Sequence, residues 1–283
     1  DLPIRPRPLP GWDNVSFRLG DELIIRLPRD DAHAPQVAKE HQWLPMLAPL
    51  LPLPIPEPVA IGKKDDAFPR KWSVYRWIEG EPVATATVDN PIRLAHDLAR
   101  FLKALEELDA SEGPPPGSHS FNRGGSLSIY DSQTRAAIDG LDFGSSTSAV
   151  VDVWDASLES TWSRPPVWVH GDVTASNLLA VDGSLSAVID FGCSAVGDPA
   201  CDLVMAWTYF PDEARHMLRR ELGLDDDTWA RGRGWAMWKA LITLVDDRLG
   251  THDATLAARR FGWRLDARQV LDRIVDDHRT ASS

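Results

Sequence analysis

Cysteine is scarce in this 283-residue chain, which contains only Cys193 and Cys201. Two cysteines do not form a disulfide framework, so we expect a reducing, cytoplasmic environment. No second Cys/His pair has the spacing of a zinc site. There is no run of about 18 apolar residues, which argues against a transmembrane helix. The Pro- and Arg-rich N-terminus lacks the apolar segment of a signal peptide. Because the chain begins at Asp1 rather than Met, a missing N-terminal segment stays open.

Basic residues are outnumbered by acidic ones, and the net charge is −12 at pH 7. This balance argues against nucleic acid and anionic membranes as partners. It is compatible with a cationic small molecule, and equally with solubility alone. Hydrophobic content of 43% and charged content of 25% are ordinary for a soluble globular enzyme. The length suits one large domain or two lobes with separate cores. The oligomeric state cannot be inferred.

One segment of the chain places polar side chains that could act in catalysis directly after apolar runs. An apolar strand up to Val169 runs into a turn that contains Asp172, and Asn177 follows five residues later. A second apolar run up to Ile189 ends in Asp190. We expect these two strands to bring the three polar side chains to the same end of a hairpin. An Asp can orient a hydroxyl group and accept its proton, and amide and carboxylate oxygens suit Mg²⁺. The pattern therefore predicts phosphoryl transfer.

These residues resemble the aminoglycoside phosphotransferase family, which is related to macrolide and choline kinases and, more distantly, to protein kinases. The family's pattern is close to H-G-D-x-x-x-x-N, then I-D-F/W-G and G-D-P-x-x-D-L, and it stands here as HGDVTASN, IDFG and GDPACDL. Thr174 departs from it, because many members carry His there. The resemblance implies that Asp172 is the catalytic residue and that Asn177 and Asp190 are metal ligands.

Other polar residues flank the motif. We interpret His170 as shaping the turn rather than as a general base. Asp198 and Asp202 follow the metal loop, and we interpret them as structural carboxylates that brace the catalytic loop. No local motif marks an acceptor pocket, so we expect the acceptor to bind among the helices that follow Asp202.

Two alternating segments, 15–19 and 22–27, predict a β-hairpin near the N-terminus. In the resembled family, a hairpin of this kind covers the nucleotide and its turn lies over the phosphates. Here that turn would be residues 11–16, which have one glycine rather than G-x-G-x-x-G. Backbone N–H groups, together with Asn14 and Ser16, would then contact the phosphates.

Arg26 follows Leu-Ile-Ile, where the kinase pattern V-A-I-K places a phosphate-binding lysine. The alternative is an ordinary cation at a strand end. A planar guanidinium suits bidentate contact with phosphate. The resemblance implies that Arg26 binds the α- and β-phosphates and pairs with Glu40, on a helix within residues 36–44. A series of prolines that starts at Pro45 is expected to break this helix.

Residues 72–78 predict a strong strand, and Glu79-Gly80-Glu81-Pro82 follows it. In the resembled family the chain crosses between lobes at this point, and main-chain groups bind the adenine. Position for position, the carbonyl of Arg76 and the amide of Ile78 would do so. The alternative is an edge strand followed by a loop.

The resemblance implies an α+β, two-lobed, protein-kinase-like fold, with a small antiparallel β lobe and a larger, mainly helical lobe. Residues 1–78 would form the N-terminal nucleotide-binding lobe. Residues 79–283 would form the C-terminal catalytic and substrate-binding lobe.

The expected activity is transfer of the γ-phosphoryl group of ATP or GTP, with Mg²⁺, to a hydroxyl of a small molecule. An aminoglycoside-type antibiotic is the leading acceptor, which would imply a role in antibiotic resistance. A macrolide, or an endogenous metabolite such as an amino alcohol or a sugar, is the alternative. A nucleotide-binding pseudokinase with a regulatory role is a second alternative, against which the complete set of Asp172, Asn177 and Asp190 argues.

Overall fold

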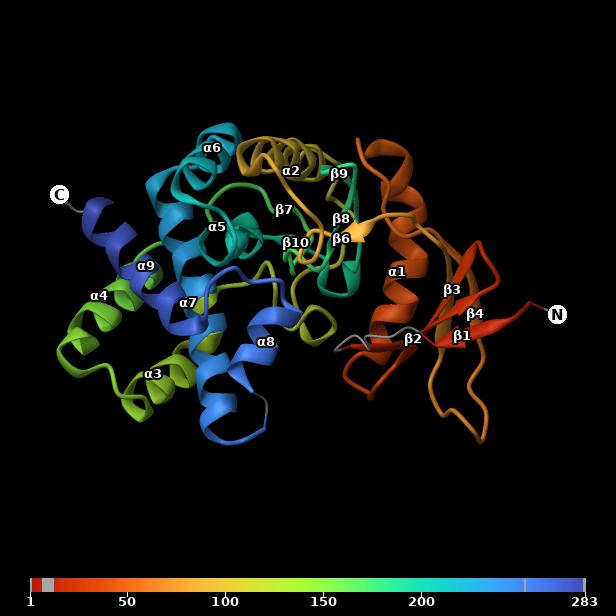
Figure 1. Ribbon diagram of the computed structural model, residues 1–283, viewed down its shortest axis with the longest axis horizontal. Helices are drawn as coiled ribbons and strands as arrows, with labels where there is room; N and C mark the ends of the chain where they lie inside the picture. The colour runs from red at the N-terminus through yellow and green to blue at the C-terminus, as the bar shows by residue number, and fades with distance from the viewer. Residues whose placement is uncertain (1, 7–12, 252, 282–283) are drawn as a thin grey trace.

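The computed structural model describes residues 2–6, 13–251 and 253–281. An antiparallel sheet with one long helix occupies one side of the molecule, and a larger, mainly helical part occupies the other (Figure 1). This arrangement confirms the predicted α+β class. Within the described residues, no helix combines the length and the apolar character that crossing a membrane would require.

The N-terminal sheet has five antiparallel strands in the order β1-β2-β3-β5-β4. The predicted hairpin is confirmed as β2 and β3, which turn at Gly20 in a left-handed conformation that suits glycine. The Pro-rich N-terminus adds an edge strand, β1, beside β2. Of the predicted phosphate-covering turn, Gly11 and Trp12 lie outside the described residues. The strands are β1 (Ile4–Pro6), β2 (Asn14–Leu19), β3 (Leu23–Pro28), β4 (Pro58–Gly62) and β5 (Trp72–Arg76).

Helix α1 (Ala34–Leu47) packs on this sheet and contains Pro45. The predicted break at Pro45 is therefore wrong. A proline in a helix removes the one hydrogen bond that its N–H would make to the carbonyl four residues earlier. Here that loss falls in the last turn, where the helix ends within two residues. The N–H of Ala48 still bonds to the carbonyl of Leu44 and closes the end.

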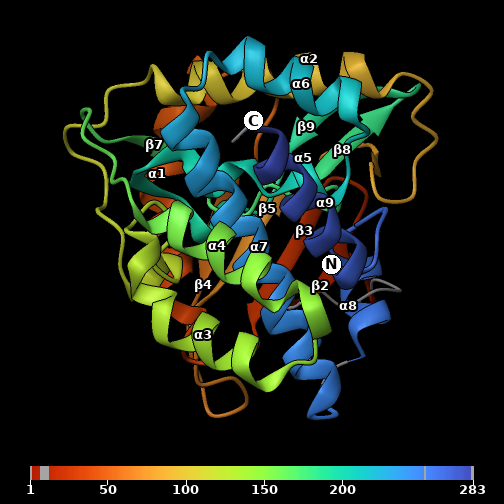
Figure 2. The ribbon, with the colours of Figure 1, turned by 90° about the vertical axis from the view of Figure 1, so that its left-hand side faces the viewer.

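The helical part is organised around α7, which packs against α3, α4 and α9 (Figure 2). Asp225 caps α7 by accepting the N–H of Thr228 at 2.7 Å. Asn90 caps α2 by accepting the N–H of Arg93, and Pro91 is the first residue of the helix. The helices are α2 (Pro91–Glu106), α3 (Asp131–Gly140), α4 (Thr147–Leu158), α5 (Met205–Thr208), α6 (Asp212–Leu222), α7 (Asp226–Arg248), α8 (Ala254–Arg260) and α9 (Ala267–Ala281).

The strands around the predicted catalytic motif pair differently from the expectation. The two predicted strands, β7 (Val167–Val169) and β9 (Ser184–Val188), do not pair with each other: β7 pairs with β10 (Ala195–Gly197). β9 instead forms a hairpin with β8 (Leu178–Val181), and β6 (Glu81–Pro82) joins its edge. The signal for that hairpin is Asp182-Gly183. Both residues have positive φ, as a two-residue turn between twisted strands requires.

Gly197 in β10 generates a test of the packing between β10 and the loop before α3. A Cβ atom at Gly197 would lie 2.0 Å from the carbonyl oxygen of Gly124, whose backbone also accepts the N–H of Asp198. We expect Gly197→Ala to lower the free energy of unfolding by at least about 2 kcal/mol, because a backbone must move to admit the methyl group.

Gly117→Ala is the control for this prediction, since Gly117 has extended backbone and its Cβ would meet only His119, at 3.6 Å. Urea denaturation of both variants measures the effect. Equal stability of the two variants would contradict the prediction.

Candidate active site

Asp172 lies in the loop between β7 and β8, and its carboxylate has two side-chain partners. The Nζ of Lys239, on α7, donates to Oδ1 at 2.6 Å. The Nδ2 of Asn177 donates to Oδ2 at 3.1 Å and to the Asp172 carbonyl at 2.9 Å. The carboxylate is therefore fixed in orientation from two sides.

The electrostatic balance at Asp172 favours the ionised form. Burial alone would raise the pKa of its carboxyl, but the charge and hydrogen bond of Lys239, together with electrostatic contributions from Arg123 and His170, lower the pKa below the ordinary value of 3.8. The Lys239 side chain is itself only 8% exposed, and its ammonium lies 4.3 Å from the centre of the Phe261 ring. Sequence reasoning missed Lys239. The available signal was a lone lysine within an otherwise apolar stretch, residues 235–242.

The turn before Asp172 is braced by Asp202, as predicted. Its carboxylate accepts the backbone N–H groups of His170 and Gly171, at 2.8 and 2.7 Å. The ring of His170 accepts the N–H of Asp172 at Nδ1, so its Nε2 carries the proton that is donated to the carbonyl of Ile189. His170 thus ties the catalytic loop to the strand end beside Asp190, which confirms its role in shaping the turn.

Asp198 is structural, but it does not brace the catalytic loop as predicted. Its Oδ2 accepts Nε of Arg231, on α7, at 2.7 Å, and both side chains are buried. Its Oδ1 accepts the N–H of Ala200. The carboxylate has this nearer cation as its partner, and it therefore anchors α7 to the segment after β10.

Asp190 follows β9 and meets Arg26 from the N-terminal sheet. The Arg26 Nη2 lies 2.6 Å from Oδ1 of Asp190, and its Nη1 lies 3.6 Å from Oε1 of Glu40 on α1. The predicted pairing of Arg26 with Glu40 is thereby confirmed. The hydroxyl of Tyr75 donates to the other Glu40 oxygen. Burial raises the pKa of Glu40. It would lower that of Arg26, but the carboxylates of Asp190 and Glu40 raise it instead.

A second connection between α1 and the loop after Asp190 was missed from the sequence. Lys39 donates to the carbonyls of Gly192 and Ser194 at 2.8 Å each, and to that of His119 at 3.2 Å. Burial lowers the pKa of this ammonium to about 8. Three carbonyls replace its hydration, so α1 and the loop are fixed relative to each other.

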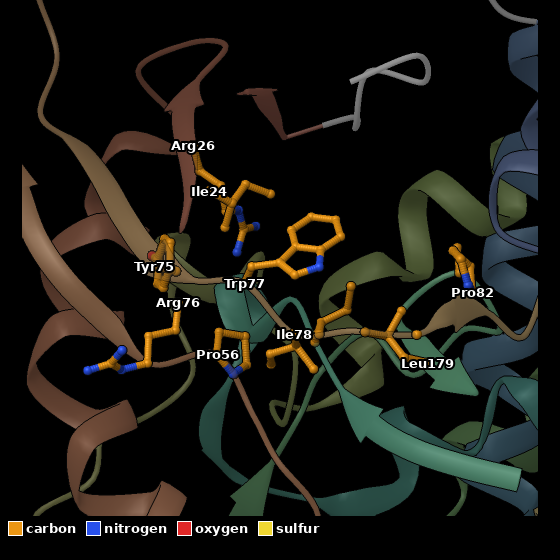
Figure 3. A pocket seen from close by; sticks show the side chains of 12 residues that line it. Ile24, Arg26, Pro56, Tyr75, Arg76, Trp77, Ile78, Pro82 and Leu179 are labelled. Carbon is orange, nitrogen blue, oxygen red and sulfur yellow. The ribbon is translucent and has the colours of Figure 1, made fainter. Parts of the chain in front are cut away.

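A mostly apolar cavity lies where the sheet meets the helical part (Figure 3). Arg76 and Ile78 both line it, and so does Arg26. The Arg76 side chain is exposed and pairs with Glu57 at 3.4 Å. Further lining comes from Ile24, Pro56, Tyr75, Trp77, Gly80, Pro82, Ser176, Leu179 and Ile189.

Asn14 and Ser16 lie on β2. Ser16 is directly opposite Arg26 on β3, so the two side chains share a face of the sheet. Asn14 shares that face by the two-residue period of a strand. Neither is among the described residues that line the cavity, so their predicted contact with phosphates stays a prediction.

Asn177 and Asp190 are brought together by the backbone. The N–H of Ile189 donates to the Asn177 carbonyl at 2.8 Å. Because the Asn177 amide nitrogen is committed to Asp172, its Oδ1 is the end left for a cation. An amide oxygen beside a carboxylate fits Mg²⁺, which takes few protein ligands and completes its shell with phosphate and water.

Two cavities lie beside these residues. Ser176 and Ile189 line the first cavity, and they are the chain neighbours of Asn177 and Asp190. Asp172 lines a second cavity, on the side of α7 and α8. Ligands in the two cavities would therefore both lie near this motif, which suits transfer of a group from one ligand to the other.

The chain is similar to known proteins in sequence and in fold. A sequence model of the phosphotransferase enzyme family matches residues 5–235. The GDP complex of an aminoglycoside 2′-phosphotransferase is similar, with a TM-score of 0.71 and 20% identity over 98% of this chain and 93% of that one. A ternary complex of a related phosphotransferase with streptomycin and ATP gives a TM-score of 0.59 and 19% identity over 87% and 85%.

A macrolide 2′-phosphotransferase from Brachybacterium faecium, solved as the apoenzyme, gives a TM-score of 0.65 and 19% identity over 93% and 94%. No curated protein sequence matches the chain. At these identities the likeness shows the fold, and it confirms the predicted kinase-like arrangement of a β lobe and a helical lobe.

The contact between Lys239 and Asp172 predicts a measurable titration. We expect Lys239→Met to raise the pKa of the Asp172 carboxyl, because burial then acts without the ammonium. In the unaltered protein the ion pair stabilises the fold above pH 3.8, and this contribution is lost as the pH falls through the lower folded pKa. The variant should lack that contribution.

A pH titration of the carboxyl ¹³C shift, assigned with Asp172→Asn, measures this pKa. Lys103→Met, at an exposed position of α2, is the control. An Asp172 titration that is unchanged in Lys239→Met would contradict the electrostatic role of the lysine.

Proposed function

The chain belongs to the phosphotransferase enzyme family, and from that premise we propose that it is a kinase of small molecules that uses ATP or GTP. The observation that carries the proposal is the position of Asp172, which lines one cavity and accepts from Asn177, while the chain neighbours of Asn177 and Asp190 line the other cavity. This is the order that donor, metal and acceptor need for transfer to a hydroxyl.

The cavity at the junction of the two parts is proposed to bind the nucleotide. Structural neighbours in complex with GDP, ATP and ADP support this assignment. The carbonyl of Arg76 and the amide of Ile78 would bind the base, and Arg26 would contact the α- and β-phosphates. In this proposal residues 1–78 form the nucleotide-binding lobe, and residues 79–283 form the catalytic and acceptor-binding lobe.

Asp172 would act mainly by positioning the acceptor hydroxyl. An ionised carboxylate, fixed by Lys239 and Asn177, can accept a hydrogen bond from the acceptor hydroxyl and direct its oxygen at the γ-phosphorus. It takes the proton late, since the transition state of phosphoryl transfer is loose. Mg²⁺, bound by Asn177 and Asp190, would offset charge on the phosphate oxygens.

Two observations concern the identity of the acceptor, and they favour different compounds. Neighbours in complex with kanamycin, streptomycin and gentamicin support the aminoglycoside predicted from the sequence. The second cavity supports the alternatives, a metabolite or a macrolide, because aromatic and aliphatic side chains line it and Lys239 already neutralises Asp172.

The buried, unbridged thiols of Cys193 and Cys201 support the proposed cytoplasmic location.

Asp172→Asn tests the proposed reaction. We expect turnover to fall at least about 100-fold, because the amide cannot accept the proton, while nucleotide affinity is retained. Release of ADP or GDP in the presence of a panel of aminoglycosides, macrolides and metabolites measures turnover, and calorimetry measures nucleotide binding. Asp182→Asn, at the exposed tip of the β8–β9 hairpin, is the matched control.

Near-normal turnover of Asp172→Asn would refute the role of Asp172. Nucleotide release that no acceptor increases would favour a pseudokinase.

Asp190→Asn tests the metal site. A carboxamide is a poorer ligand for Mg²⁺ than a carboxylate, so the increase in nucleotide affinity on adding Mg²⁺ should shrink or disappear. Calorimetry of ATP and GTP binding with Mg²⁺ and with a chelator measures it, with Asp182→Asn again as the control. An unchanged Mg²⁺ effect would remove Asp190 from the metal site.

A further inference from the structure

The cavity beyond Asp172 has an apolar wall. Phe121, from the loop before α3, and Trp238 and Ile242, on α7, contribute to it. Ala257 and Phe261, from the α8 region, complete this wall. Such a lining favours a ligand with an apolar or aromatic body, because rings and aliphatic groups gain by leaving water against it.

The acidic groups at this cavity already have partners. Asp172 is paired with Lys239 at 2.6 Å, and Asp13 lies 3.2 Å from the imidazole of His33. Contact with Asp13 and Asp30 raises the pKa of His33 to about 9, so this imidazole is cationic at neutral pH. Asp246 lies further along α7 and accepts from the hydroxyl of Thr251. A cationic ligand at Asp172 or Asp13 would therefore have to displace a cation that already contacts the carboxylate.

Arg123 also lines this cavity. Among the described residues, no carboxylate lies within ion-pair distance of its guanidinium. Its guanidinium lies 4.5 Å from the ring of Trp238 and 5.1 Å from that of Trp235. Its one side-chain hydrogen bond within the described part of the chain is a long contact of 3.5 Å to the Tyr130 hydroxyl. Stacking on two indoles orients the planar fork and leaves its N–H groups free for an anion.

The backbone that carries Arg123 is fixed in an unusual conformation. Phe121 and Asn122 have φ values of +47° and +55°, and Gly124 has +80°. Left-handed conformations at two consecutive non-glycine residues are unfavourable and persist only where the surroundings enforce them. The Tyr130 hydroxyl donates to the Phe121 carbonyl at 2.6 Å, which anchors the loop at the cavity wall.

We propose that the acceptor of this kinase is a hydroxyl compound with an apolar or aromatic body and an anionic group, a carboxylate or a phosphate, which Arg123 binds. The inference rests on the proposed function and specifies its acceptor. Arg123 and Asp172 line the same cavity, so an acceptor with its anion on the guanidinium has its hydroxyl within the reach of Asp172. The class is that of hydroxy acids and phosphorylated alcohols, rather than polyamines.

The test uses matched pairs of aromatic and aliphatic hydroxy acids with their neutral amides, such as 3-phenyllactate and 3-phenyllactamide, together with kanamycin. Each compound is measured in two ways on the full chain: equilibrium binding with Mg²⁺ and a non-hydrolysable nucleotide, and acceptor-dependent release of ADP or GDP. The variants are Arg123→Met, Arg123→Lys and Arg100→Met. Arg100 is an exposed residue of α2, and its replacement controls for the loss of one positive charge.

We expect acids to bind better than their amides, and Arg123→Met to weaken the binding of acids, but not of amides, by at least about tenfold, as for a hydrogen bond to a charged group. Arg123→Lys should restore part of the affinity, and Arg100→Met should match the unaltered protein. In turnover, the loss should appear in KM for the acid.

Three results would overturn the inference. The first is that no acid binds better than its amide. The second is that kanamycin is the better ligand and is insensitive to Arg123→Met. The third is that Arg123→Met lowers kcat alike for every acceptor, which would assign the guanidinium to the transferred phosphoryl group. Because binding is measured separately, Arg123-dependent binding of acids without phosphorylation would refute the kinase function alone.

Discussion

The ion pair between Asp172 and Lys239 joins a loop in the middle of the chain to a helix near its end. A buried carboxylate without a partner takes up a proton, and it then cannot orient a hydroxyl or receive its hydrogen. Lys239 keeps the charge on Asp172, and Asn177 fixes its rotation. Because α7 carries Lys239 and is also anchored through Arg231 to Asp198, the packing of the helical part determines the electrostatics of the site.

The sheet is connected to the same loop by side chains rather than by strand pairing. Arg26 meets Asp190, and Lys39 binds the carbonyls just after it. Both cations come from the N-terminal part, and both are buried or nearly so. A movement of the sheet would therefore displace Arg26, which is proposed to contact phosphate, and the loop at Asp190, which is proposed to bind the metal, at the same time. This coupling is how a cleft between two parts can act as one site.

Contiguous motifs in the sequence were enough to place Asp172 beside Asn177, because the two are five residues apart in one loop. Asp190 follows the β8–β9 hairpin, which returns the chain to Asn177. Arg26 and Glu40 could be placed through the resemblance. Lys239 and Arg123 could not, since each reaches the site from a distant element and no spacing links it to the motif. The pairing of β7 with β10 was missed because apolar runs do not specify partners, although Asp182-Gly183 indicated the β8–β9 turn. Pro45 was misjudged because a proline near the end of a helix costs only one hydrogen bond.

The central claim is that the phosphoryl group passes from the nucleotide to a hydroxyl of a small molecule positioned by Asp172. The most direct measurement follows a γ-labelled nucleotide by mass spectrometry and ³¹P NMR in the presence of candidate acceptors. The account predicts that the label appears on an acceptor hydroxyl as a phosphate ester. Label that appears only as inorganic phosphate, at the same rate with and without every acceptor, would contradict it.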